Sequence, residues 1–327
     1  MPPAISIDEL TKDYAVGFWR KRPYRALDRL SLDIEAGEIF GFLGPNGAGK
    51  TTTLKLLMQL IFPTSGSARI LGRPVGDLAA RQRIGYLPEN PSFYDYLTAE
   101  ELLHYFGQLF GLSAAESRAR VPALLDRVGL GAERRLQLRK FSKGMIQRVG
   151  IAQALLNDPE VIFLDEPMSG LDPLGRRDVR SLILELRDQG RTVFFSSHIL
   201  SDAEALCSRV AIVAAGRLAA SGRLSEMLAF EIRGWELVVG DLGPDVVERL
   251  GAAVTRATEI SPGRYTLELP ADAQPGAVLS QLSALGARVV SLNPLRPTLE
   301  DFFVRQVRDA GAGARASFAG ESDRASR

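Results

Sequence analysis

One stretch of this chain decides its fold: Gly44-Pro45-Asn46-Gly47-Ala48-Gly49-Lys50-Thr51-Thr52. It follows the pattern G-x-x-x-x-G-K-[ST], in which a glycine-rich loop wraps the phosphates of a nucleotide. An apolar run at residues 39–43 precedes it and predicts a buried strand, and apolar residues at helical spacing follow it (Leu54, Leu57, Met58 and Ile61). The loop is therefore expected between a strand and a helix N-terminus, where backbone N–H groups and the helix dipole favour phosphate.

All nine residues of this stretch are candidate nucleotide ligands, and two of them have specific expected roles. Lys50 would reach the β- and γ-phosphates, and the Thr51 hydroxyl would ligate Mg²⁺. The alternative is a glycine-rich turn that binds no ligand. We disfavour it because the strand, the loop, the Lys-Thr pair and the helix occur in the required order.

The composition limits the classes of protein to which the chain can belong. Its 327 residues suffice for one large core or two, and 40 Lys and Arg against 39 Asp and Glu give a formal net charge of +1. This balance provides no general electrostatic basis for binding nucleic acid or an anionic membrane. The single cysteine, Cys207, cannot form an internal disulfide. Because the sequence has neither a span-length apolar run nor signal-peptide features, we expect a soluble, cytosolic chain whose membrane partner, if any, is another polypeptide.

Residues 1 to about 230 are predicted to form a nucleotide-binding α/β domain. Short continuous apolar runs are typical of parallel strands buried on both faces, and three of them occur here (residues 161–164, 192–195 and 210–213). From about residue 90 to residue 158 the apolar spacing is helical and predicts a helical subdomain. The basic, aromatic stretch 17–25 is expected to be a solvated loop between two strands, with a local anion or phospholipid contact as the alternative.

Residues 231 to about 307 have a different pattern, which predicts a small α+β domain. Alternating segments indicate strands, and helical spacing recurs around Val246 and Val278. The order β-α-β-β-α-β is that of the ferredoxin-like arrangement. Thr298 is expected to cap a last helix, and the Gly/Ala/Ser/Arg-rich residues 308–327 predict a disordered tail.

Two acidic residues, Asp165 and Glu166, end the apolar run Val161-Ile-Phe-Leu. In an open α/β sheet, ligands bind outside the carboxyl ends of the strands, so both acids should lie beside the phosphate loop. One acid would hold Mg²⁺, directly or through water, and the other would polarise the water that attacks the γ-phosphate. A solvated strand end is the alternative.

Two histidines and one helix start complete the set of candidates. His198 closes another apolar strand, where its imidazole would contact the γ-phosphate or fix the attacking water; a packed or capping histidine is the alternative. His104 lies on a helical stripe, and we interpret it as structural. Ser142 is expected to cap a helix that carries Gly144 in its first turn, which creates a second helix N-terminus suited to anions. By itself this would be an ordinary capped helix.

Together these motifs resemble those of the ATPase subunit of an ATP-binding-cassette (ABC) transporter. Residues 44–51 match the Walker A motif of that family, residues 161–166 its Walker B motif with the catalytic glutamate, and residues 169–172 its D-loop. His198 corresponds to the switch histidine, and residues 141–145 take the place of the signature motif. The resemblance covers residues 5 to about 230, and the order and spacing of the motifs make it specific.

Further positions are assigned by the resemblance or depart from it. Tyr14 lies where the family stacks an aromatic ring on adenine. Lys143 and Met145 replace a glycine and a glutamine of the signature motif, and Glu89 replaces the glutamine of the Q-loop, where it is a candidate metal ligand. These departures resemble the motifs of the branch of the family that works with separate ABC-2-type exporter permeases. That branch also carries an extra C-terminal α/β domain ending in Leu-Glu-Asp-Phe-Phe, as at residues 299–303.

The resemblance implies an α/β P-loop ATPase domain with a helical subdomain, a ferredoxin-like C-terminal domain, and the ligands ATP and Mg²⁺. Two copies would form a head-to-tail homodimer around two ATP molecules. In each half, Lys50, Thr51 and Asp165 of one subunit hold the ATP, and Ser142 and Gly144 of the other close over it. Hydrolysis, with Glu166, His198 and Lys50 as catalytic residues, would power export through an integral membrane permease of ABC-2 type, at the cytoplasmic side of the cell membrane.

Two other functions fit parts of the sequence. The first is a soluble ABC ATPase that acts on ribosomes or nucleic acid, but such proteins usually carry a second cassette, long coiled coils or basic arms. None of these occurs here, so we expect no nucleic-acid partner. The second is an adaptor in which ATP is only a structural ligand, which the intact Asp165, Glu166 and His198 disfavour. The exported substrate and the role of the C-terminal domain, for which we expect dimerisation or regulation, are not encoded in recognisable motifs.

Overall fold

The computed structural model describes residues 2–17, 22–227, 233–243, 253–295 and 298–308. Contacts between Cα atoms divide the chain into two compact units. One unit runs to Leu224 and includes the described residues from Phe303 onward, and the other runs from Ser225 to Phe302. The domain boundary predicted near residue 230 falls among residues 228–232, outside the described residues. Each unit is described by itself below.

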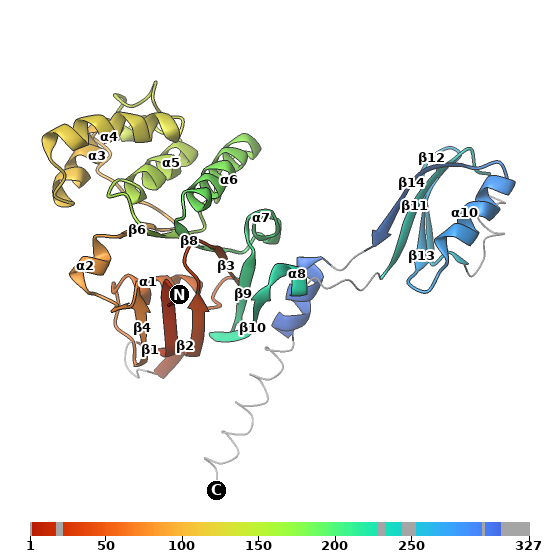
Figure 1. The fold of residues 1–327 in the computed structure, drawn as a ribbon, viewed down its shortest axis with the longest axis horizontal. Helices are drawn as coiled ribbons and strands as arrows, with labels where there is room; N and C mark the ends of the chain where they lie inside the picture. The colour runs from red at the N-terminus through yellow and green to blue at the C-terminus, as the bar shows by residue number, and fades with distance from the viewer. Residues whose placement is uncertain (1, 18–21, 228–232, 244–252, 296–297, 309–327) are drawn as a thin grey trace, which may run out of the picture. The chain divides into compact units, whose positions relative to one another are not determined.

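The first unit is built on a six-stranded sheet with the order β10-β9-β3-β8-β7-β6 (Figure 1). Five strands are parallel, and β10 is an antiparallel edge strand. Every residue of β3 and β7 is buried, as expected for strands covered on both faces. The bounds are β3 (Ile39–Leu43), β6 (Ile84–Leu87), β7 (Val161–Asp165), β8 (Thr192–Ser197), β9 (Arg209–Ala214) and β10 (Arg217–Arg223).

A second, antiparallel sheet of the same unit has the order β2-β1-β4-β5. Its strands are β1 (Ile5–Val16), β2 (Arg22–Ile34), β4 (Ser65–Ile70) and β5 (Arg73–Pro74). Residues 22–25 were expected in a loop, and that prediction was wrong for them. They continue β2 because each pairs with a residue of β1, from Asp13↔Arg25 to Val16↔Arg22.

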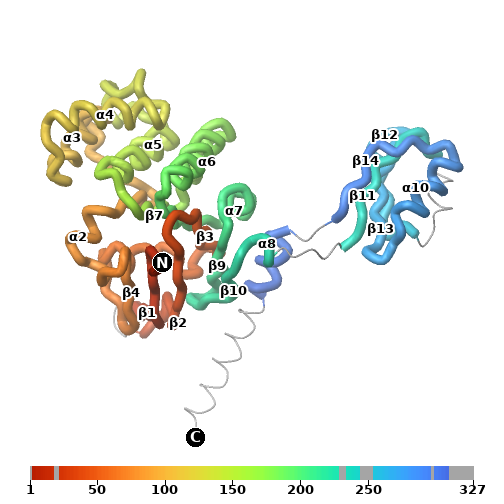
Figure 2. Tube along the Cα trace, in the orientation of Figure 1, coloured from red at the N-terminus to blue at the C-terminus, as the bar shows by residue number. Residues whose placement is uncertain are grey.

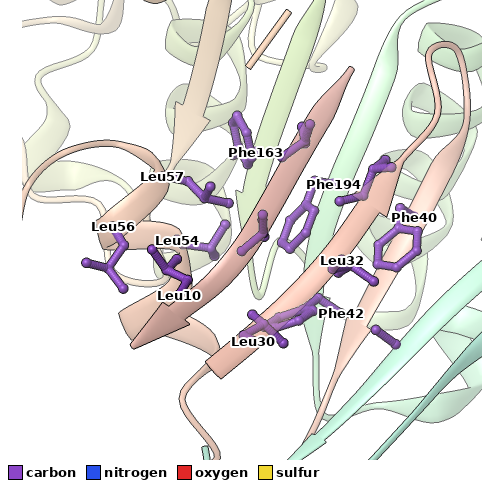
Figure 3. Packing of buried hydrophobic residues seen from close by; sticks show 14 of the residues in the cluster. Leu10, Leu30, Leu32, Phe40, Phe42, Leu54, Leu56, Leu57, Phe163 and Phe194 are labelled. Atoms are coloured by element: carbon purple, nitrogen blue, oxygen red, sulfur yellow. The ribbon is translucent and has the colours of Figure 1, made fainter. Parts of the chain in front are cut away.

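The core of the first unit lies where the two sheets and helix α1 (Lys50–Leu57) meet (Figure 3). Phe194 of β8 contacts the rings of Phe40, Phe42 and Phe163, with centroids 5.2 to 5.9 Å apart. Leucines of β1, β2 and α1 complete the cluster (Leu10, Leu30, Leu32, Leu54, Leu56 and Leu57). Each such side chain stabilises the fold by about 1.5–3 kcal/mol relative to exposure. This packing fixes the strand end and the helix start that flank the phosphate loop.

Three helices pack against one another and form the predicted helical region: α3 (Ala99–Leu109), α4 (Ala114–Arg127) and α5 (Lys143–Ala154) (Figures 1 and 2). Thr98 and Ser113 start α3 and α4 with complete capping boxes. His104 Nδ1 lies 2.7 Å from Ser117 Oγ and joins these two helices, in agreement with its structural interpretation.

The remaining elements of the unit are short, except for one long helix. They are α2 (Leu78–Arg81), the 3₁₀ turn η1 (Leu138–Lys140), α6 (Pro173–Asp188), α7 (Leu200–Leu206) and α8 (Leu224–Met227), the last of which crosses the division between the units. Within the described ranges, no helix is both long and apolar enough to cross a membrane.

The second unit contains a four-stranded antiparallel sheet with the order β12-β13-β11-β14. Its elements are β11 (Gly234–Gly240), β12 (Arg256–Ser261), β13 (Arg264–Pro270), α10 (Pro275–Ala284) and β14 (Arg288–Leu295). This strand order is the one that a β-α-β-β-α-β chain adopts in the ferredoxin-like arrangement. The core joins Leu237 and Leu267 of the sheet to Leu282 of α10.

Two predictions for the C-terminal region lie partly outside the described residues. The helix predicted around Val246 falls within residues 244–252, and the tail after residue 308 falls within residues 309–327. The last helix is present at residues 299–308. Thr298 caps it as predicted: its hydroxyl accepts from Asp301 N at 3.2 Å, and Asp301 Oδ2 accepts from Thr298 N at 3.0 Å.

Candidate functional site

The carboxyl ends of four neighbouring parallel strands carry most of the predicted site residues. The phosphate loop follows β3, His198 follows β8, Asp165 and Glu166 end and follow β7, and Glu89 comes shortly after β6. Since these strands are adjacent in the order β3-β8-β7-β6, parallel pairing places all four segments at one edge of the sheet.

The phosphate loop depends on glycines that no other residue can replace without strain. Gly49 is the N-cap of α1 with φ +106°, and a Cβ atom there would lie 2.7 Å from Ala26 O. At Gly44 a Cβ atom would lie 2.5 Å from Val213 O. Lys50 folds back over the loop, and its Nζ atom donates to Gly44 O at 2.7 Å and to Pro45 O at 3.4 Å. The loop therefore holds a buried ammonium group at a helix N-terminus, the arrangement that binds phosphate.

A cavity of about 430 Å³ opens above this loop. Most of the predicted ligands line it, together with Tyr24 and Ala26 of β2 (Tyr14, Pro45, Asn46, Gly47, Gly49, Lys50, Thr51, Thr52, Glu89, Glu166 and His198). Gly44, Ala48 and Asp165 do not line the cavity: Gly44 accepts from Lys50, Ala48 is buried in the core, and Asp165 is fully buried at the end of β7. A crevice of similar size between α4, α5 and α6 contains none of the predicted site residues.

Asp165 is fully buried at the end of β7, and its two carboxylate oxygens differ. Oδ1 accepts a hydrogen bond from Ser196 Oγ at 2.5 Å, whereas Oδ2 has no hydrogen-bond partner in the described part of the chain. Burial raises the pKa of Asp165; the hydroxyls of Ser196 and Thr51 oppose this shift, and the negative charges of Glu89 and Glu166 add to it. A buried carboxylate with an unpaired oxygen fits a hard cation, which would compensate both the charge and the missing contact.

Glu166 lies between Lys50 and His198 in the cavity. Its Oε2 atom is 2.8 Å from His198 Nδ1, and its Oε1 atom is 3.5 Å from Lys50 Nζ. The backbone of Glu166 has φ +50°, which is uncommon for a residue with a side chain. Its amide donates to both the carbonyl and the hydroxyl of Ser196 at 3.2 Å, so β8 holds the strained conformation in place. In this conformation the carboxylate of Glu166 lies beside the phosphate-loop lysine.

Ser142 and Gly144 are placed elsewhere on the molecule. Ser142 caps α5 as predicted, since its hydroxyl accepts from Met145 N at 3.3 Å. Both residues line a separate groove of about 550 Å³, together with Lys143 and the segment Gly170–Asp172. The structure therefore does not bring Ser142 or Gly144 into the phosphate-loop cavity of the same chain.

Three residues of the site were not found from the sequence. Ser196 binds both Asp165 and Glu166, but nothing in the run Thr192–Ser197 distinguishes a serine that faces the neighbouring strand. Tyr24 was missed because residues 17–25 were interpreted as a loop, and only its pairing with β1, Tyr14↔Tyr24, places it in the site. Ala26 follows that stretch, and no motif marks it.

Known proteins with similar sequences indicate the same family as the sequence motifs. The family model described as "ABC transporter" matches residues 27–169. An ABC transporter ATP-binding protein of Synechocystis is 48% identical over 305 residues, which are 93% of this chain and 84% of that protein. The Nod factor export ATP-binding protein I of Paraburkholderia xenovorans is 39% identical, over 83% of this chain and 88% of its own length.

Solved structures agree with this assignment. An ATP-binding subunit of an ABC transporter shares 33% identity with a TM-score of 0.61, over 68% of this chain and 91% of its own. An ATP-binding cassette solved as a dimer in a post-hydrolysis state, bound to ADP and Pi, shares 27% identity with a TM-score of 0.62, over 67% of this chain and 98% of its own. The chain therefore belongs to the ATP-binding subunits of ABC transporters, which are ATPases with the P-loop fold.

Proposed function

We propose that this chain hydrolyses ATP to power export through a separate membrane permease. One observation carries the proposal: Glu166 contacts both Lys50 and His198 in the cavity above the phosphate loop. Nucleotide hydrolysis needs a cation for the phosphates, a carboxylate that activates water, and a group that orients this carboxylate. All three are present in one cavity, at the end of the sheet where ligands bind.

In this proposal Glu166 is the general base, and Lys50 controls its availability. The Lys50 ammonium contacts Gly44 O, Pro45 O and Glu166 Oε1, so the phosphates of ATP compete for the same donor. Once the ammonium turns to phosphate, Glu166 Oε1 is free to accept a proton from the attacking water. His198 keeps the carboxylate in position through its 2.8 Å contact with Oε2.

Thr51, Asp165 and Glu89 are the proposed Mg²⁺ ligands. When bound, the metal would neutralise the charge that develops on the phosphates. The unpaired Oδ2 of Asp165 and the negative charge of Glu89 nearby fit a cation that prefers oxygen ligands. In the described ranges, no three His, Cys, Asp or Glu side chains gather as a metal cluster. Mg²⁺ does not require one, because it is usually held by one or two carboxylates together with substrate phosphates and water.

The proposed functional unit is a head-to-tail homodimer with ATP between the subunits. Ser142 caps the N-terminus of a twelve-residue helix, whose free N–H groups favour phosphate. Because Ser142 and Gly144 line a groove apart from the phosphate-loop cavity, they reach the nucleotide only if a second copy supplies them. The cassette solved with ADP and Pi is dimeric, which supports this arrangement.

The proposed partner is an integral membrane permease of ABC-2 type, with this chain on the cytoplasmic side of the cell membrane. One support comes from the relatives named Nod factor export ATP-binding protein. The other comes from Lys143, Met145 and Glu89, which depart from the usual family motifs as the ABC-2 branch does. The similar proteins named above are transporter subunits and do not favour a ribosome- or nucleic-acid-bound ATPase. Co-purification of the tagged chain with a membrane protein supports this proposal, and co-purification with RNA contradicts it.

The variant Glu166→Gln tests the catalytic assignment. It keeps the size of the side chain and one acceptor oxygen but cannot accept a proton, so phosphate release should fall by roughly 10²–10⁴-fold while ATP binding is retained. Glu185→Gln on the surface of α6 is the matched control and should leave turnover unchanged. Near-normal steady-state turnover of Glu166→Gln would remove Glu166 from the role of base.

A further inference from the structure

Two tyrosines from neighbouring strands face the cavity above the phosphate loop. Tyr14 of β1 and Tyr24 of β2 are directly opposite each other in an antiparallel pair. Opposite residues project from the same face of a sheet, with Cβ atoms about 4.5–5.5 Å apart. Both side chains line the cavity that contains Lys50 and Thr51. Both tyrosines therefore contribute to the wall of this cavity.

Only one face of the Tyr14 ring is free to stack on a base. The Lys12 ammonium lies over the ring, 5.3 Å from its centroid, and is held there because it also donates to Phe62 O at 2.6 Å. A planar base can stack on the opposite face alone. Additional contact on that side of the cavity has to come from a neighbouring strand, and Tyr24 is the residue that β2 presents there.

The position of Tyr24 along β2 matches the end of the cavity away from the phosphates. Ala26, two residues further on, faces the same cavity and lies against the loop, since its carbonyl leaves no room for a Cβ atom at Gly49. The register shifts between Lys12↔Leu27 and Asp13↔Arg25, so Ala26 lies at a bulge of β2, two residues from Tyr24. A nucleotide whose phosphates lie on Lys50 therefore extends past Ala26 towards Tyr24.

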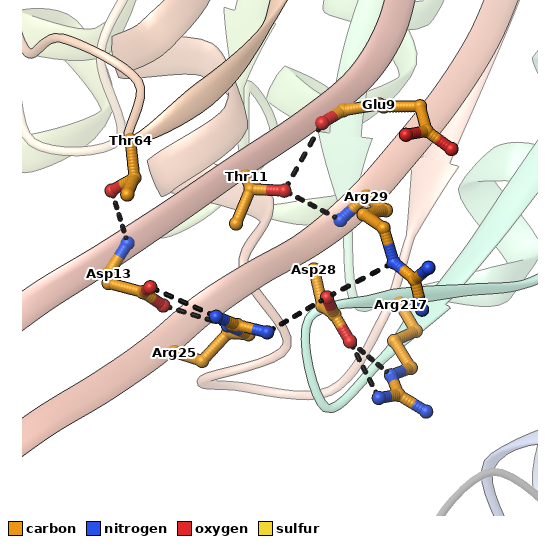
Figure 4. Close-up of polar contacts among 8 residues, drawn as sticks. All are labelled: Glu9, Thr11, Asp13, Arg25, Asp28, Arg29, Thr64 and Arg217. Atoms are coloured by element: carbon orange, nitrogen blue, oxygen red, sulfur yellow. Dashed lines mark hydrogen bonds and ion pairs between the residues drawn. The ribbon is translucent and has the colours of Figure 1, made fainter.

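A network of charges on the strand pair fixes this wall (Figure 4). The neighbouring cross-strand pair, Asp13 and Arg25, projects from the opposite face and forms a two-pronged contact at 2.9 and 3.1 Å. Arg25 also contacts the buried Asp28, whose other oxygen accepts from Arg217 of β10 at 2.7 Å. The register that places Tyr24 opposite Tyr14 is thus held from the far side of the sheet.

Tyr24 is not explained by packing. The residue is 53% exposed, and it follows exposed residues at the start of β2. A large aromatic ring at such a position contributes little to the core. We propose that Tyr24 is a second base-contacting residue, so that the base of the bound nucleotide lies against two tyrosines, one from each strand. The inference rests on the proposed ATP binding and extends it to the recognition of the base.

The test compares the binding of Mg-ATP and Mg-tripolyphosphate by isothermal titration calorimetry, using the full chain. Stacking of one base on one aromatic ring is worth enough that Tyr24→Ala should weaken Mg-ATP binding by about 5- to 100-fold. Tripolyphosphate has no base, so the affinity of Tyr24→Ala for Mg-tripolyphosphate should stay within about twofold of the affinity of the unsubstituted chain. Tyr24→Phe keeps the ring and should bind Mg-ATP normally. Tyr96→Ala removes another exposed tyrosine, away from the cavity, and should have no effect.

The outcomes separate this inference from the proposed function. If the unsubstituted chain binds no Mg-ATP, the proposed function itself fails. If it binds and Tyr24→Ala binds equally well, only the role of Tyr24 is overturned. A parallel loss of ATP and tripolyphosphate affinity also overturns it, because the substitution would then act through the loop. Tyr24→Leu, which keeps an apolar side chain in the strand, serves if the alanine variant does not fold, and the same ATP-specific loss is expected.

Discussion

The buried carboxylate of Asp165 should lower the stability of the protein in the absence of ligand. Its Oδ2 atom has no hydrogen-bond partner among the described residues, and an unsatisfied buried acceptor costs about 1–3 kcal/mol. The charges of Glu89 and Glu166 add repulsion. Asp165→Asn retains an acceptor for Ser196 and leaves a polar atom in the place of Oδ2, but it removes the buried charge and its repulsion from Glu89 and Glu166. We therefore expect the free energy of unfolding to increase by about 1–2 kcal/mol at neutral pH, which raises Tm by roughly 2–8 °C for a unit of this size.

The same substitution should abolish the benefit of Mg-ATP. A ligand present at 100 times its Kd stabilises the folded state by about 2.7 kcal/mol, and the unsubstituted chain should gain this amount. Asp165→Asn lacks the metal-binding carboxylate and should gain little. The order of Tm values in differential scanning calorimetry should therefore reverse: the variant melts higher without nucleotide, and the unsubstituted chain melts higher with Mg-ATP.

Asp202→Asn is the matched control for this prediction. Asp202 is also buried, but it accepts from the Arg180 guanidinium, so losing its charge leaves a cation without its partner and should lower Tm. The pH dependence has a fixed sign. Because the pKa of Asp165 is raised in the folded state, the ionised carboxylate destabilises the fold at high pH, and this destabilisation is lost as the pH falls through the raised pKa. The difference in Tm between Asp165→Asn and the unsubstituted chain should therefore shrink on acidification. A Tm of Asp165→Asn below that of the unsubstituted chain at pH 8 without nucleotide would refute the reasoning.

Four further predictions concern single side chains. Lys50→Ala should abolish tight ATP binding in a fluorescent-nucleotide titration, because the buried ammonium is the cation of the loop; retained affinity would contradict this. Glu89→Gln should raise the Mg²⁺ concentration needed for half-maximal ATP binding by a few-fold, since an amide is a weaker ligand than a carboxylate, and an unchanged Mg²⁺ titration would exclude Glu89 as a ligand. Phe194→Ala should lower the free energy of unfolding by about 3–5 kcal/mol in urea denaturation, because three phenylalanines pack on its ring; a loss below 1 kcal/mol would disprove that packing. Glu160→Gln should cost at most about 1 kcal/mol at pH 7: Arg83 lowers the pKa of Glu160, so the pair stabilises the fold above the ordinary pKa of a glutamate, and the difference in Tm should vanish as the pH falls through the lowered value.

The sequence was sufficient to place the residues whose positions follow from strand order. Asp165, Glu166 and His198 each end or follow a short apolar run, and parallel pairing brings such ends to one edge of a sheet. The phosphate loop was predictable for the same reason, because its glycines are tied to a strand end and a helix start. Thr298 could be identified as a cap because capping is a local interaction.

The features that were missed depend on contacts between distant segments. Residues 22–25 are polar and aromatic, and only their pairing with β1 makes them a strand. Strand β4 begins with the polar residues Ser65, Gly66 and Ser67 and belongs to the sheet because β1 pairs with it. The positive φ of Glu166 depends on Ser196, which lies 30 residues further along the chain. Periodicity within one segment contains none of this information.

The central claim is that ATP joins two copies of this chain, and the mass of Glu166→Gln in sedimentation equilibrium tests it most directly. With Mg-ATP, this hydrolysis-deficient variant should sediment at twice the 35.6 kDa of one chain, and a second substitution, Ser142→Arg, should restore the monomer without preventing nucleotide binding. A variant that binds Mg-ATP and remains a monomer throughout would contradict the account.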